Sequence, residues 1–118
     1  MLLEKAMAML LVGASAAACG SAELQMSGRQ HQVNQAIWAA EQGGAERDPR
    51  SARLLEQARR EMLDARETAD DGDERNAALL LDRAEADSRL ALQIARTTEE
   101  REKAQRAWQE LGAARSEF

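Results

Sequence analysis

Two rows of small and apolar residues at heptad spacing lie on either side of Gly72, and they constrain the fold of this chain more than any other feature. Their spacings alternate between three and four residues, which places each row on one side of an α-helix, as in antiparallel hairpins and coiled coils. Reflection about Gly72 makes the two rows face each other. The rows are Leu55, Ala58, Met62, Ala65 and Ala69, widened by Leu54 and Leu63, then Ala77, Leu81, Ala84, Ser88, Ala91 and Ala95.

Residues that begin or end helices divide the chain into three predicted helices. Glycine favours helix C-termini, whereas Asp is a good N-cap and Pro a good first residue. Such residues stand at Gly43-Gly44, Asp48-Pro49 and Asp71-Gly72-Asp73. We therefore expect helices over residues 27–42, 49–70 and 74 to about 112. The first also carries an apolar row, made by Val33, Ile37 and Ala40.

The third predicted helix is far longer than the second, so the second can cover it only as far as Ala95. We expect the remainder to project as an exposed, charged helix, with Trp108 and Leu111 as a docking patch. In a competing layout the helix breaks at Thr97, because Thr97-Thr98-Glu99-Glu100 matches a capping box, and folds back into a four-helix bundle. The predicted fold class is all-α, an antiparallel helical hairpin or three-helix bundle with a long, partly projecting third helix.

Charge and composition exclude several function classes. The net charge is −5, from 16 basic and 21 acidic residues. A nucleic-acid-binding surface or a polybasic membrane binder needs a basic excess, so we expect neither. Large apolar residues are scarce, but alanine and the other strong helix formers argue against disorder. The core should therefore be narrow and lined by alanine.

Residues 1–18 are typical of a bacterial export signal. Lys5 precedes an uncharged run over residues 6–18, which is too short to span a bilayer. The run ends in Ala16-Ala17-Ala18-Cys19-Gly20, which resembles the lipobox of bacterial lipoproteins. That resemblance implies lipid on Cys19, removal of residues 1–18, a tether over 19–26 and a domain over 27–115. It also implies an outer-membrane destination facing the periplasm. Cleavage by an ordinary signal peptidase, leaving a free thiol, and an uncleaved cytoplasmic chain are the alternatives.

Residues 36–95 carry a set of small, apolar and turn residues: Ile37, Ala40, Gly44-Ala45, Pro49, Leu55, Ala58, Leu63, Ala65, Gly72-Asp73, Leu81, Ala84, Ala86-Asp87, Arg89-Leu90-Ala91 and Ala95. With this set the segment resembles the bacterial family catalogued as domain of unknown function 4398, an Ala-rich helical hairpin. Members are typically envelope lipoproteins. The resemblance implies no catalytic residues, and it does not imply direct peptidoglycan binding by this chain.

The sequence contains no recognisable catalytic or metal-binding constellation. His31 is the only histidine and has no second imidazole or thiolate nearby for a zinc site, so we interpret it as an exposed helix residue. The acidic residues 70–74 do not match the spacing of a calcium loop and are interpreted as a capped turn. Cys19 has no histidine partner that would make it a nucleophile.

Four residues are candidates for partner binding: Trp108, Leu111, Trp38 and Asp87. Trp38 and Trp108 are interpreted mainly as partial core, with a partner contact as the alternative because Trp is enriched at interface hot spots. Asp87 lies beside the apolar row, so we interpret it as an ion-pair partner of Arg59 or Arg60, with a recognition carboxylate as the alternative.

These features predict a non-enzymatic, lipid-anchored structural or interaction module of the bacterial cell envelope. It needs no cofactor and no metal, and it binds the membrane through its lipid and an envelope protein through its helices. The alternative is an accessory lipoprotein that regulates an envelope enzyme. A ligand carrier is disfavoured because alanine-lined contacts leave little cavity.

Overall fold

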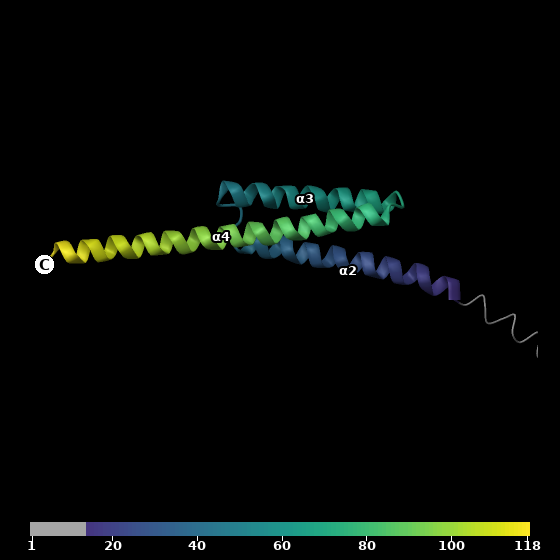
Figure 1. The fold of residues 1–118 in the computed structure, drawn as a ribbon, viewed down its shortest axis with the longest axis horizontal. Helices are drawn as coiled ribbons and strands as arrows, with labels where there is room; N and C mark the ends of the chain where they lie inside the picture. The colour runs from purple at the N-terminus through teal and green to yellow at the C-terminus, as the bar shows by residue number, and fades with distance from the viewer. Residues whose placement is uncertain (1–13) are drawn as a thin grey trace, which may run out of the picture.

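The structure is a computed structural model that describes residues 14–118, with side chains from residue 23 onward. Within that range it contains three helices and no strand: α2 (Ala14–Gln42), α3 (Pro49–Asp70) and α4 (Glu74–Ser116). α4 lies in the middle, with α3 along one side and α2 along the other (Figure 1). The described residues form an elongated rod (Figure 1). The predicted all-α fold is therefore confirmed.

The core is a narrow layer of small and apolar side chains between the three helices. Every residue of the predicted α4 row is buried, as are all three residues of the α2 row. The buried members of the α3 row are Leu55, Ala58, Met62 and Ala65. Leu63 was expected to widen the α3 row, but it is exposed, because it points away from both neighbouring helices.

The same backbone motif ends α2 and α3. In α2, Gly44 has a φ of 82°, its N–H donates to Glu41 O, and the N–H of Ala45 donates to Ala40 O. Gly72 has a φ of 87° and repeats these two bonds at the end of α3, with Ala69 O and Thr68 O as acceptors. This is the Schellman motif, which needs a left-handed residue that glycine adopts without strain.

The outer ends of two helices differ from the prediction. α2 begins at Ala14, whereas a helix from residue 27 and a tether over 19–26 were expected. The segment 21–26 is polar, but it consists largely of strong helix formers, and propensity outweighs polarity there. α4 runs through Gly112 to Ser116, because one exposed glycine weakens a helix by about 1 kcal/mol without ending it. Residues 1–13 of the predicted signal peptide lie outside the described residues.

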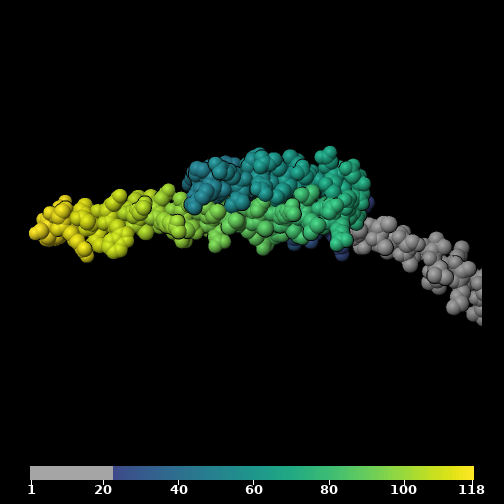
Figure 2. Space-filling model, turned by 45° about the horizontal axis from the view of Figure 1, so that its top comes forward, coloured from purple at the N-terminus to yellow at the C-terminus, as the bar shows by residue number. Residues whose placement is uncertain are grey.

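The second half of α4 projects beyond the other two helices, as expected (Figure 1). Every residue from 99 to 118 is exposed. The competing four-helix layout is therefore wrong, because the Thr97-Thr98-Glu99-Glu100 segment continues the helix without a break. Figure 2 shows α3 lying against one end of α4 and leaving the other end bare.

Two glycines offer a matched test of the turn geometry. A Cβ at Gly28 or at Gly72 meets no atom within 4 Å. Replacement by alanine therefore adds no side-chain contact and changes only the free-energy cost of the backbone conformation at that position. We expect Gly72→Ala to lower the free energy of unfolding by about 1 kcal/mol, because its φ is positive. Gly28→Ala should raise it by up to about 1 kcal/mol, because Gly28 lies inside α2. Urea denaturation followed by circular dichroism measures both, and a neutral Gly72→Ala variant would contradict the turn described above.

Candidate interaction surface

The bundle ends where the N-terminus of α3 meets α4. Asp48 caps α3 by accepting a hydrogen bond of 2.8 Å from the backbone N–H of Arg50. Its second carboxylate oxygen accepts a hydrogen bond of 2.7 Å from the hydroxyl of Thr98 on α4. Thr98 is thus the last α4 residue with a side-chain hydrogen bond to another element in the described structure. The capping role of Asp48 was predicted; its link to Thr98 was not, because it joins residues 50 positions apart.

Both hydrogen bonds favour the charged form of Asp48. The Thr98 hydroxyl first, and then the Arg50 N–H, lower the pKa of the carboxyl from 3.8 to about 2. Since the folded pKa is below the unfolded one, this contribution to stability is present above about pH 4 and is lost as the pH falls towards 2.

The projecting half of α4 carries two of the four predicted partner-binding residues. Trp108 is 70% exposed and Leu111 is 43% exposed. Trp38 is 62% exposed and lies on α2, in the bundle and apart from Trp108 and Leu111. The interpretation of the tryptophans as partial core is therefore wrong. Helices that touch over alanine and serine leave no space between them for an indole ring.

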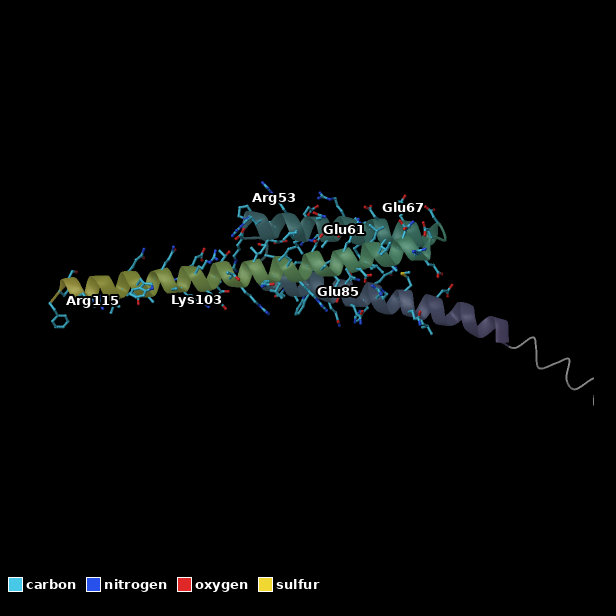
Figure 3. All side chains as sticks on the ribbon, viewed as in Figure 1. Arg53, Glu61, Glu67, Glu85, Lys103 and Arg115 are labelled. Carbon is cyan, nitrogen blue, oxygen red and sulfur yellow. The ribbon has the colours of Figure 1, made fainter. Side chains whose placement is uncertain are left out.

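Asp87 was expected to pair with Arg59 or Arg60, and neither ion pair is present. Arg59 binds Glu41 at 2.7 Å and Glu46 at 2.8 Å instead, which ties α3 to the end of α2 and to the following loop. Asp87 lies beside the carboxyl group of Glu61, an acid on the side of α3 that faces α4 (Figure 3). The heptad spacing correctly predicts that Asp87 lies near α3, but spacing does not determine which α3 side chain meets it.

Glu61 is the unexpected acid of the interface. It is 9% exposed, its Oε1 accepts a hydrogen bond of 3.1 Å from Gln57, and its Oε2 is buried with no partner. Burial raises the pKa of Glu61, the neighbouring Asp87 raises it further, and Gln57 and Arg83 oppose the shift. The sequence could have indicated it, because Glu61 lies three residues after Ala58 and four before Ala65, both buried members of the α3 row.

Replacing Glu61 with glutamine should stabilise the chain at neutral pH. Because the folded pKa is raised, the folded state binds the proton more tightly, and stability falls as the pH rises above the unfolded value of 4.5. The amide of Glu61→Gln can donate to Asp87 at every pH, so we expect a gain of about 1 kcal/mol at pH 7 that shrinks below pH 4.5. Urea denaturation across pH 3.5–8 measures the difference.

Glu67→Gln is the matched control, since Glu67 is an exposed acid on the same helix (Figure 3). It should change stability by less than about 0.5 kcal/mol at each pH. A Glu61→Gln gain that is equal at pH 4 and pH 7 would show that the buried charge is not its cause.

The described side chains show no grouping suited to metal binding. His31 is exposed and bonds to Gln35 at 3.0 Å, as expected of a solvent-facing helix residue. Among residues 23–118, whose side chains are described, no three His, Cys, Asp or Glu side chains are grouped to hold a metal ion. Between residues 14 and 118 no helix combines the length and apolarity needed to cross a bilayer. Only the backbone of Cys19 is described, within α2.

No protein-family model, curated protein or solved structure matches this chain.

Proposed function

We propose that this chain is a lipid-anchored helical module of the bacterial cell envelope that holds or spaces a protein partner and performs no catalysis. The observation that carries the proposal is the position of the two ends of the rod. The N-terminal end of α2, which includes Cys19, and the bare half of α4 lie at opposite ends of the molecule (Figure 1). A lipid on Cys19 would hold one end at a membrane, and the exposed helix would reach away from it.

Two further features support the proposal. The Ala16-Ala17-Ala18-Cys19-Gly20 junction resembles a lipobox. The projecting half of α4 exposes an indole and a leucine side chain, and aromatic groups of this kind often anchor protein interfaces. The Ala-rich hairpin, similar to that of envelope lipoproteins, is consistent with the same role.

The anchor is tested by expressing the full chain in a bacterium and measuring the intact mass of the membrane-associated form. We expect residues 19–118 with a lipid attached to Cys19. Cys19→Ser should move the protein out of the membrane fraction, whereas Ser21→Ala, a nearby control, should leave it there. A mature form that begins at Cys19 without lipid, or one that retains Met1, contradicts the proposal.

A further inference from the structure

α4 carries a second row of apolar and small residues, on the side opposite to the buried one. Leu81 is fully buried and Leu90 is 45% exposed. They are nine residues apart, and nine residues at about 100° each place them on opposite sides of a helix. This second row also has heptad spacing and continues through the projecting half, interrupted by the charged residues Arg83 and Glu100: Leu79, Ala86, Leu90, Gln93, Thr97, Ala104, Ala107, Leu111, Ala114 and Phe118.

This second row is not covered by the other described helices. α3 and α2 lie along the two edges of the buried row of α4, so the side opposite to that row stays open: Leu79 is 53% exposed and Leu90 45% (Figure 2). Heptad rows of this length are the usual contact surface of coiled coils. The open row therefore has the form of a helix-binding face.

We propose that this face binds the same face of a second copy of the chain, with the two α4 helices antiparallel and centred near residue 102. In this register each projecting half lies along the bundle of the other copy. Leu111 then meets Gln93, Ala114 meets Leu90, and Ala107 meets Thr97 of the second copy. Residues 86–118 overlap in both copies, a contact about 50 Å long at 1.5 Å per residue. The proposal does not depend on the lipid anchor.

The charges beside the row favour this register. They bring opposite charges together between the copies, pairing Arg96 with Glu110, Arg89 with Glu117, and Asp87 with Arg115. Within the described part of one chain, five of these six side chains make no ion pair, the exception being Arg89 with Glu85. Asp87, which has no basic partner of its own, would gain one.

The register also provides a site for Trp108. A groove of about 210 Å³ lies between α4 and the first turn of α3, lined among others by Leu90, Ile94, Thr97 and Arg50. Trp108 of the second copy lies opposite Ile94 in the antiparallel pair, over this groove. Its indole ring, which is 70% exposed in the single chain, would lie against Leu90 and Ile94 there, with Arg50 beside it.

Charge repulsion makes a parallel pair of α4 helices less favourable than the antiparallel pair. In the antiparallel pair, the like charges that meet at the centre have acidic neighbours. Parallel helices would put Arg96 beside Arg101, and Asp82 beside Asp87, two repulsions against the single attraction of Glu110 and Arg115. In the antiparallel pair Arg101 and Lys103 each meet their own symmetry mate. Glu100 of the second copy lies next to Arg101, and Glu99 binds Lys103 at 2.8 Å within each chain, so both charges are balanced.

Single-cysteine cross-linking in the full-length Cys19→Ser chain, in mild detergent, distinguishes these arrangements. Cys19 is the only cysteine, so each variant has one thiol. A short bifunctional maleimide should join Arg101→Cys to its second copy, because this position lies at the two-fold centre. It should fail with Leu111→Cys, since the two copies of that position lie about 27 Å apart at 1.5 Å per residue. Cross-linking of Leu111→Cys in preference to Arg101→Cys would overturn the proposal.

Charge reversal tests the register by sedimentation equilibrium. Glu110→Arg should weaken dimerisation about tenfold, because the symmetry disrupts two ion pairs at once. The double variant Arg96→Glu/Glu110→Arg should restore the dimer to within about threefold of the parent, since both pairs are re-formed with reversed charge. Glu102→Arg, the same charge change on the opposite side of α4, should have no effect. A chain that stays monomeric at every concentration, or a double variant that is not restored, would overturn the proposal.

Discussion

The contact of one α4 row with two helices at once is the constraint on which the rest of the structure depends. Its members are alanine and serine except for Leu81, so α2 and α3 can both approach α4 closely. Ser88 behaves as a small apolar residue there because its hydroxyl donates to Ala84 O at 2.7 Å. Gly43 serves the same purpose at the end of α2, where any larger residue would collide with Leu92. Narrow packing of this kind excludes aromatic side chains from the core and leaves them on the surface.

Polar contacts decide where the bundle stops. Asp48 binds Thr98, and Arg59 joins α3 to Glu41 and to the α2–α3 loop. Beyond Glu102, α4 continues with no neighbour among the described residues, although an isolated helix of this length would be marginal in water. Extension of α4 beyond the bundle requires no new helix nucleation, because the preceding turns of α4 are already formed within the bundle. Pairs such as Glu99 with Lys103, 2.8 Å apart, support the exposed part.

The direction of the two α4 helices in the proposed dimer determines where its two membrane anchors would lie. An antiparallel pair of α4 helices would place the two α2 N-termini at opposite ends of a longer rod. Lipids on both copies of Cys19 would then tether the assembly at two separate points. Such a rod would lie along one membrane or join two, and in both cases it would hold its anchors at a set separation. This is the behaviour expected of a spacer, and the acid pair of Glu61 and Asp87 would lie inside it.

The sequence by itself determined the three helices, their caps and the buried rows, since these depend on spacing and on local chemistry. Leu81, Ala84 and Ser88 could be placed in the core because their heptad row, reflected about Gly72, faces the apolar row of α3. Gly72 could be placed in the turn because it interrupts the two rows. Only the tertiary structure decided that α4 lies between the other two helices, that Glu61 rather than an arginine meets Asp87, and that Thr98 reaches Asp48. These contacts join residues far apart in the chain, and their partners depend on the rotation of each helix about its axis. The tryptophans illustrate the limit: hydrophobicity favoured burial, but the distance between closely packed helices left no space for them.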